Sequence, residues 1–128
     1  MFKGRTLTSS FAVKDPDAAK RFYGDTLGLD IRDAREPGML EIHGTGGSPI
    51  LVYPKPDHEP AVFTVLNVTG PDIDAAVDGL IAAGVAMEHY DSEWLKTDAK
   101  GIARDDRGPA IAWFKDPSGN IVSVLQER

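Results

Sequence analysis

Glu41 and His43 are the two side chains in this sequence best suited to acid/base chemistry. They lie two residues apart in a strand-like run, so they would share one face of a strand. Imidazole titrates near neutral pH, and a carboxylate beside it can exchange protons with it. A solvated strand edge would show the same pattern, so both interpretations stay open. The remaining histidines, His58 and His89, do not have the spacing of a metal-binding motif.

The composition of the chain excludes several kinds of site and partner. The chain has no cysteine, which excludes disulfides, thiolate metal ligands and a thiol nucleophile, and which fits a cytoplasmic protein. The Gly46-Gly47-Ser48 turn lacks the strand-to-helix context of a nucleophile elbow. The net charge of −6 argues against nucleic acid and anionic membranes as partners, because both require clustered Lys and Arg.

Two similar segments indicate an internal repeat. Asp15-Pro-Asp-Ala-Ala19 and Asp72-Ile-Asp-Ala-Ala76 each place an aspartate where it would cap the N-terminus of a helix. Apolar residues follow at helical spacing in both segments. Gly28 and Gly84 are placed to end the two helices in the left-handed conformation. The pattern therefore predicts two helices in equivalent positions.

Strand-like runs surround each predicted helix in the same order. One run precedes each helix and three follow it, which predicts a βαβββ module twice. We expect a single domain, 1–128, made of modules 1–56 and 61–128 joined by the proline-rich segment 54–60. Segment 91–106, with Trp94 inside it, is either an ordered loop that covers a site or a disordered one. The expected strands are 6–13, 30–32, 39–43, 50–53, 61–68, 86–90, 110–114 and 121–126.

Two of these segments resemble a known family. The string from Val13-Lys-Asp-Pro to Leu-Gly-Leu29 is similar to the first helix of the vicinal-oxygen-chelate superfamily, the glyoxalase, bleomycin-resistance and extradiol-dioxygenase group. The string Trp113-Phe-Lys-Asp-Pro-Ser-Gly-Asn-Ile-Val-Ser-Val-Leu125 is similar to its final hairpin. The resemblance implies an α+β fold in which two βαβββ modules form a curled mixed sheet, an incomplete barrel, around a cleft. It also implies a homodimer.

The resemblance also implies where a metal would bind. Metal-dependent members supply a histidine from the first strand of each module and a glutamate from the last strand. The matching positions here are Thr8, then Phe63 or Val65, and Ser123. A hydroxyl is a weak metal donor and a hydrocarbon side chain is none. We therefore expect no metal cofactor, with a divalent metal on other ligands as the alternative.

Strand alternation predicts which side chains face the cleft. Leu7, Phe11 and Val13 should pack on the first helix, and the opposite face should line the site. A mixed apolar and polar lining is typical of small-molecule pockets, and aromatic faces suit a cationic or planar ligand. Trp113 and Tyr53 would alternatively belong to the core or to a dimer interface. The expected ligand-binding residues are Thr8, Ser10, Tyr53, Phe63, Val65, Asn67, Trp94, Trp113 and Ser123.

The function expected from these residues is small-molecule binding of the bleomycin-resistance type, by sequestration or carriage, without the usual metal ligands. The alternative is an enzyme of the same fold. It would be a lyase, isomerase or extradiol dioxygenase with a non-standard metal site, or a metal-free acid/base catalyst that uses Glu41 and His43. A third hypothesis is an accessory domain whose cleft has lost its function.

Overall fold

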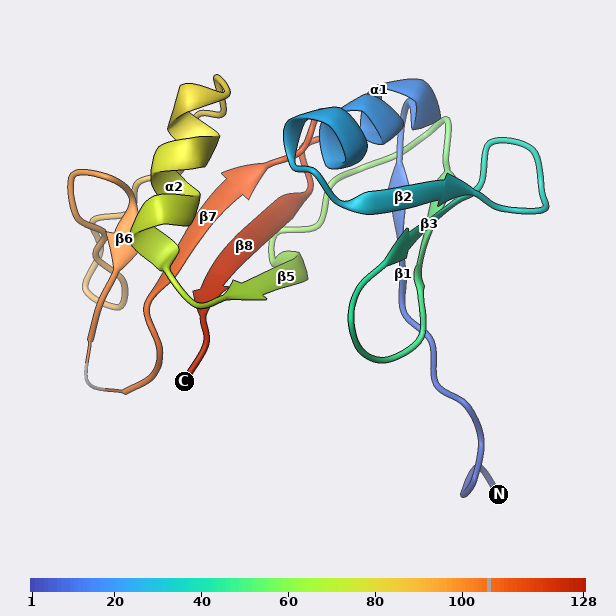
Figure 1. Ribbon diagram of the computed structural model, residues 1–128, viewed down its shortest axis with the longest axis horizontal. Coiled ribbons are helices and arrows are strands. Elements are labelled where there is room, and N and C mark those ends of the chain that lie inside the picture. Colours follow the sequence, from blue (N-terminus) through green and yellow to red (C-terminus); the bar gives the residue numbers. More distant parts are fainter. Residues whose placement is uncertain (106) are drawn as a thin grey trace. The chain divides into compact units, whose positions relative to one another are not determined.

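The chain divides into two compact units in this computed structural model, Met1–Glu59 and Pro60–Arg128 (Figure 1). The structure describes residues 1–105 and 107–128. The division falls inside segment 54–60, where the prolines indicated a linker.

Unit 1 contains one helix and one four-stranded sheet. Its elements are β1 (Ser10–Val13), α1 (Pro16–Lys20), the π-helical continuation η1 (Arg21–Thr26), β2 (Asp30–Asp33), β3 (Leu40–His43) and β4 (Ile50–Pro54). The strand order is β1-β4-β3-β2. β1 runs parallel to β4, and the other neighbours are antiparallel.

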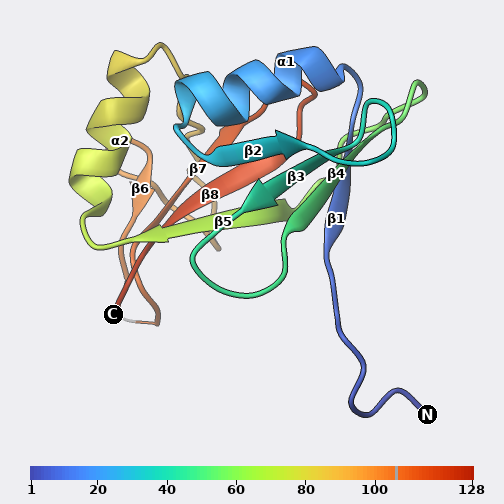
Figure 2. The same ribbon diagram turned by 45° about the vertical axis from the view of Figure 1, so that its right-hand side comes forward.

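Unit 2 repeats this arrangement. Its elements are β5 (Thr64–Gly70), α2 (Ile73–Ala82), β6 (Ile102–Ala103), β7 (Ile111–Lys115) and β8 (Ile121–Gln126). The strand order is β5-β8-β7-β6, again with the first strand parallel to the last, and Figure 2 shows β5, β8 and β7 side by side. The two mixed sheets and their helices confirm the predicted α+β class and the repeated module.

The helix ends confirm the capping pattern. The Asp15 carboxylate accepts from the backbone N–H of Asp17 at 3.0 Å, and the Asp72 carboxylate accepts from that of Ala75 at 3.1 Å. Gly28 and Gly84 adopt φ values of 74° and 88°, which a residue with a Cβ reaches only with strain. None of the helices in residues 1–105 and 107–128 is long and apolar enough to span a membrane.

Each helix packs on one face of its own sheet. In unit 1 the rings of Phe11 and Tyr23 meet with centroids 5.8 Å apart. Alternate strand residues therefore form the core, and the other alternate residues lie on the opposite face, which we call the open face. The buried apolar residues are Phe11, Val13, Ala19, Tyr23, Leu40, Ile42 and Val52 in unit 1, and Ile73, Val77, Met87, Ile102, Ala103, Ala112, Phe114, Val122 and Val124 in unit 2.

Two of the expected strands are shorter than the sequence predicted. The run 6–13 becomes a strand only at Ser10, because its partner β4 begins at Ile50 and the ladder pairs Ser10 with Leu51. The Ser9 carbonyl still accepts from the Leu51 N–H at 3.0 Å, but residues 6–8 lie outside the ladder, and Leu7 is 82% exposed instead of packed on the helix.

The expected strand 86–90 is a single bridge between Met87 and Phe114. The same edge of β7 is also used by β6, in which Ile102 pairs with Ala112. The edge is therefore shared by two short segments. They pass so closely that a Cβ on Gly101 would lie 2.9 Å from the carbonyl oxygen of Glu88.

Residues 91–97 form a hydrogen-bonded hairpin. Its arms are joined by the bridge between Asp91 and Lys96 and by the Thr97 N–H, which donates to the Tyr90 carbonyl at 2.9 Å. Ser92 closes the tip by accepting from the Leu95 N–H at 3.0 Å. Within the predicted loop 91–106, residues 91–97 thus form a hairpin and 102–103 form β6, whereas residue 106 lies outside the described residues.

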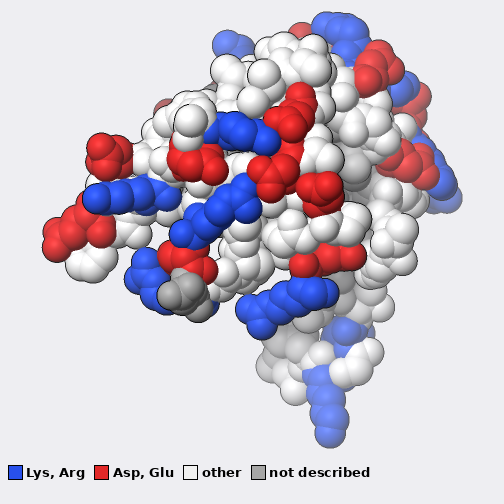
Figure 3. Space-filling model, turned by 60° about the vertical axis from the view of Figure 1, so that its left-hand side comes forward, with Lys and Arg blue, Asp and Glu red and all other residues white. Residues whose placement is uncertain are grey.

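Ion pairs connect α2 with the segment before β7, on a surface where Figure 3 shows acidic and basic groups interleaved. Lys100 Nζ lies 2.7 Å from Asp78 Oδ1, and Arg104 Nη2 lies 2.8 Å from Asp74 Oδ1. The hydrogen bonds from Arg104 and then from Lys100 lower the pKa of Asp74 below its ordinary value of 3.8. The charged form of Asp74 is therefore favoured by folding.

We expect this network to add a small, acid-sensitive contribution to stability. A carboxyl whose pKa is lowered by folding stabilises the protein above its unfolded pKa, and this contribution is lost as the pH falls through the lowered folded value. The melting temperature of the Asp74→Asn variant should lie below that of the original protein at pH 7, and the two should converge as the pH is lowered from 7 to below the ordinary value of 3.8. Thermal unfolding across this range measures the difference, with Glu93→Gln in the exposed hairpin as the control. A constant difference at every pH would contradict the assignment.

Candidate ligand-binding face

Asn67, Ser123 and Trp113 form one row across the open face of unit 2. The β5–β8 ladder pairs Asn67 with Ser123, and the β7–β8 ladder pairs Ser123 with Trp113. Paired residues point to the same side of a sheet. Their neighbours Val122 and Phe114 are buried on the helix side, so the row lies on the open face. Three of the predicted ligand-binding residues are thus brought together.

The indole of Trp113 crosses the central strand of this sheet. Its Nε1–H donates to Thr64 Oγ1 at 3.2 Å. Trp113 is on β7 and Thr64 is on β5, while β8 lies between them. The ring must therefore extend over β8, whose Ser123 is 0% exposed. The hydrogen bond at Nε1 restrains the orientation of the ring, and Trp113 remains partly exposed.

Tyr90 flanks this ring. The two ring centroids are 5.5 Å apart with an interplanar angle of 86°, an edge-to-face arrangement that aromatic pairs prefer. Tyr90 is itself held by Thr97, whose hydroxyl accepts from the Tyr90 N–H at 2.9 Å. Sequence reasoning did not select Tyr90 for the site. Its ring contact is with Trp113 on β7, a different part of the chain, so no local sequence pattern indicates it.

Ser123 and Asn67 are joined by their side chains. The buried Ser123 hydroxyl donates to Asn67 Oδ1 at 2.5 Å. Asn67 itself is exposed on β5, an edge strand of the sheet. A buried hydroxyl thereby has its hydrogen-bond partner, and an exposed amide is held in one orientation.

Charged side chains occupy the open face of unit 1. His43 Nε2 lies 3.0 Å from Glu41 Oε2, with side chains 24% and 33% exposed. Across the β2–β3 ladder, Arg32 is paired with Glu41 and Asp30 with His43. Arg32 forms a two-point contact with Asp30, with Nη2 2.7 Å from Oδ2, and this hydrogen bond lowers the pKa of Asp30.

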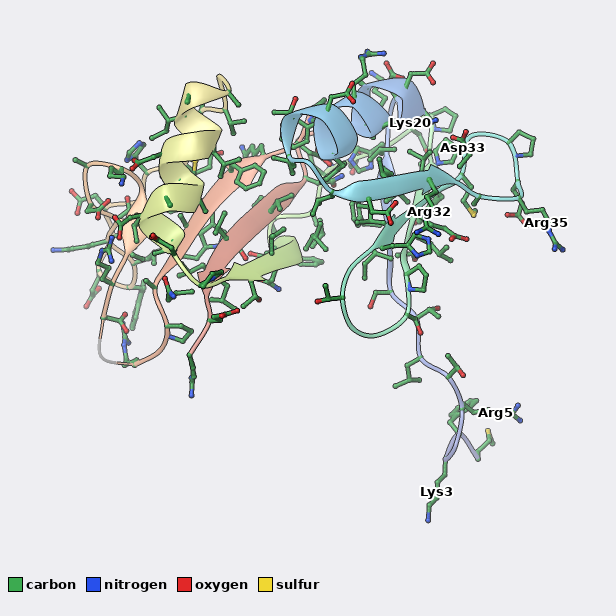
Figure 4. The ribbon with its side chains drawn as sticks, in the orientation of Figure 1. Lys3, Arg5, Lys20, Arg32, Asp33 and Arg35 are labelled. Atoms are coloured by element: carbon green, nitrogen blue, oxygen red, sulfur yellow. The ribbon has the colours of Figure 1, made fainter. Side chains whose placement is uncertain are left out.

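Arg32 lies on the side of β2 away from the helix. Its neighbour Asp33 lies on the helix side, where Lys20 Nζ approaches it to 3.0 Å (Figure 4). Sequence reasoning missed Asp30 and Arg32, although their alternation on a strand opposite Glu41 and His43 was a usable signal.

The other predicted ligand-binding residues lie in varied positions. Ser10 and Tyr53 are on the open face of unit 1, since Ser10 pairs with Leu51, which pairs with Glu41. Val65 lies at the irregularity between Thr64 and Leu66 in β5. The remaining three are exposed and lie outside the strands: Thr8 before β1, Phe63 before β5 and Trp94 at the hairpin tip. Phe63 is 66% exposed and Trp94 is 78% exposed.

The residues that the resemblance predicts at the family's metal positions have side chains that are poor metal donors. Ser123 uses its hydroxyl hydrogen in the bond to Asn67, Phe63 and Val65 offer hydrocarbon, and Thr8 is outside the strand. Within the part of the chain that the structure describes, no group of three or more His, Cys, Asp or Glu side chains is arranged to hold a metal ion. Imidazole and carboxylate donors would be needed for the metals in question.

Comparison with known proteins places the chain in a family. The sequence model of the Glyoxalase/Bleomycin resistance protein/Dioxygenase superfamily matches residues 6–124. The chain belongs to this superfamily. The vicinal-oxygen-chelate resemblance drawn from the first helix and the final hairpin is therefore confirmed.

Solved structures of the superfamily share the fold. One is TnmS3, an antibiotic binding protein from Streptomyces sp. CB03234, which is 25% identical, with a TM-score of 0.64 and 98% of both chains covered. Another is a putative glyoxalase family protein from Bacillus anthracis, which is 18% identical, with a TM-score of 0.72 and both chains covered completely (100%). The second likeness concerns the fold alone.

One sequence relative is a much longer protein that matches only part of this chain. The chain is 36% identical over 69 residues to a glutamyl-tRNA(Gln) amidotransferase subunit of Brachyspira hyodysenteriae. The match covers 52% of this chain but only 14% of that protein. The chain thus spans a small part of that relative, and the activity in the relative's name is not transferred to it.

Proposed function

We propose that this protein binds a planar small molecule on the open face of unit 2 and acts by holding or sequestering it. The observation that carries the proposal is the fixed indole of Trp113, held by Thr64 at one end and flanked by Tyr90. A rigid aromatic ring gives contact area with little loss of conformational entropy on binding. The similarity to an antibiotic binding protein supports a small molecule as the ligand.

The surroundings of the ring match the usual composition of a small-molecule site. Ile121 and Leu125 lie on the same face as Ser123 and are only partly buried, so apolar surface adjoins the ring. Asn67 adds an exposed amide at the edge strand. Such sites combine mostly apolar surface with a few polar groups that orient the ligand.

The proposal predicts stabilisation by ligand. Thermal unfolding would be measured with a panel of planar aromatic antibiotics and dyes, each at increasing concentration. A compound that binds only the folded protein stabilises it by about 2.7 kcal/mol at a hundred times its Kd. At least one compound should raise the melting temperature in this concentration-dependent way. A panel without any shift would contradict the proposal, as would stoichiometric iron, zinc, manganese or nickel in protein purified without chelator, which would indicate a metalloenzyme.

A second candidate function rests on the contact between Glu41 and His43. A carboxylate 3.0 Å from an imidazole, both partly exposed, is an arrangement able to transfer protons to and from a substrate. The two functions are separated by incubating the protein with the compound that raises its melting temperature and then analysing that compound. Recovery of unchanged ligand supports binding alone, whereas a product that disappears with Glu41→Gln and His43→Gln supports acid/base catalysis.

A further inference from the structure

We infer that Ser123 orients the Asn67 amide as a hydrogen-bond donor, so that the ligand beside Trp113 presents an acceptor oxygen, such as a carbonyl, to Asn67. The inference rests on the proposed binding of a planar ligand on this face and adds the chemical class of that ligand.

The first step is the burial of Ser123. Its side chain is 0% exposed, so its hydroxyl must find a partner within the protein or leave a buried polar group unpaired. Asn67 Oδ1 is that partner, and the hydroxyl donates to it. Because the carbonyl end of the Asn67 amide is directed toward β8, the amino end is directed away from it.

The second step concerns the two hydrogens of Asn67 Nδ2. An amide group carries two donors on nitrogen and acceptor lone pairs on oxygen. Among residues 1–105 and 107–128, no hydrogen bond is recorded from Asn67 Nδ2, and the residue is exposed on an edge strand. The site therefore offers donors at this position, while its acceptor oxygen is already engaged.

The third step is the position of Asn67 relative to the indole. Asn67 lies one strand beyond Ser123, and neighbouring strands are about 4.8 Å apart. The indole extends over β8 toward Thr64 on the same strand as Asn67. A planar ligand stacked on the indole therefore has its rim near Asn67, where a carbonyl oxygen would accept from Nδ2.

The test uses two matched probes, fluorenone carboxylate and fluorene carboxylate. They share shape and charge, and only the first carries the ring carbonyl. By isothermal titration calorimetry the protein should bind the ketone about five- to tenfold more tightly, which is the effect of one hydrogen bond. The readout is the ratio of the two affinities. General damage to the site would weaken both probes and leave this ratio unchanged.

Asn67→Asp replaces the amino group by an oxygen of similar size and should abolish the preference or reverse it. Ser123→Ala should reduce the preference toward equality, because the amide is free to rotate, while the affinity for fluorene carboxylate changes little. Thr69→Ala, on the same strand and face, is the control and should keep the ratio. Circular dichroism confirms that each variant is folded.

Equal affinity of the original protein for both probes, or an unchanged ratio in Asn67→Asp, would overturn the inference and leave the proposed binding function standing. Failure of both probes to bind would instead contradict the proposed planar-ligand function, and with it the inference. A preference that survives in Ser123→Ala but not in Asn67→Asp would remove the positioning role of Ser123.

Discussion

Trp113→Ala is expected to weaken the binding of a planar ligand by about tenfold or more, because it removes the ring on which the ligand stacks. The indole contributes a flat surface that the Thr64 hydrogen bond holds in place. Its loss also uncovers Ser123 and leaves Tyr90 without its aromatic neighbour. Titration of fluorenone carboxylate into both proteins measures the change in Kd.

Two further variants separate stacking from general damage. Trp113→Phe retains an aromatic face but loses the hydrogen bond to Thr64, so its affinity should lie between those of the original protein and Trp113→Ala. Trp94→Ala removes the other tryptophan, which is 78% exposed at the hairpin tip, and should bind the probe normally. If Trp94→Ala reduced affinity more than Trp113→Ala, the ligand would be bound at the hairpin and not on the sheet.

Asp116→Ala should lower the free energy of unfolding by about 3 kcal/mol, since it removes several hydrogen bonds to a buried carboxylate. Asp116 is 5% exposed, and its Oδ1 accepts from the Ser118 and Asn120 N–H groups, each at 2.9 Å. Its Oδ2 accepts from Asn120 Nδ2 at 3.0 Å, and Asn120 is 2% exposed. Without the carboxylate these donors lose the acceptor that joins them, and the turn between β7 and β8 is held less firmly.

Urea unfolding measures this change, which should appear as a lower midpoint with an unaltered slope. Asp57→Ala is the control. It removes an aspartate whose side chain is 81% exposed in the ion pair with Lys55, and it should leave the midpoint almost unchanged. Equal midpoints for Asp116→Ala and the original protein would show that the turn tolerates loss of these bonds.

Local chemistry explains why much of the fold was predictable. Asp15 and Asp72 act on backbone groups two or three residues away, and Gly28 and Gly84 end their helices within the same segments. The turn at Asp116 is equally local, because its acceptor and donors lie within four residues. Such features can be read from short stretches of sequence.

The errors concern elements that depend on partners far along the chain. Residues 6–8 have the alternation of a strand, but β4 begins too late to pair with them. Segment 86–90 competes with Ile102 and Ala103 for one edge of β7. A periodicity shows that a segment is able to form a strand, but it carries no information about which edges remain free.

The candidate site was partly predictable for the same reason. Asn67, Trp113 and Ser123 were selected because alternation along strands identifies residues on one face. The contribution of Tyr90 and the Trp113–Thr64 bond depend on the strand order of the folded sheet. Ser123 was noted as a lost metal ligand. In the structure Ser123 is buried, and its hydroxyl donates a hydrogen bond to the side chain of Asn67.

The most direct test of the central claim uses the two tryptophans of the chain, Trp94 and Trp113, which give two indole Nε1–H signals in a nitrogen–proton correlation spectrum. The Trp94→Phe variant lacks one of these signals and so assigns both. The signals would then be followed while fluorenone carboxylate is added. Binding on the open face of unit 2 predicts a saturable shift of the Trp113 signal, together with the Asn67 side-chain amide, and an unmoved Trp94 signal. A shift of the Trp94 signal with a stationary Trp113 signal would contradict the account.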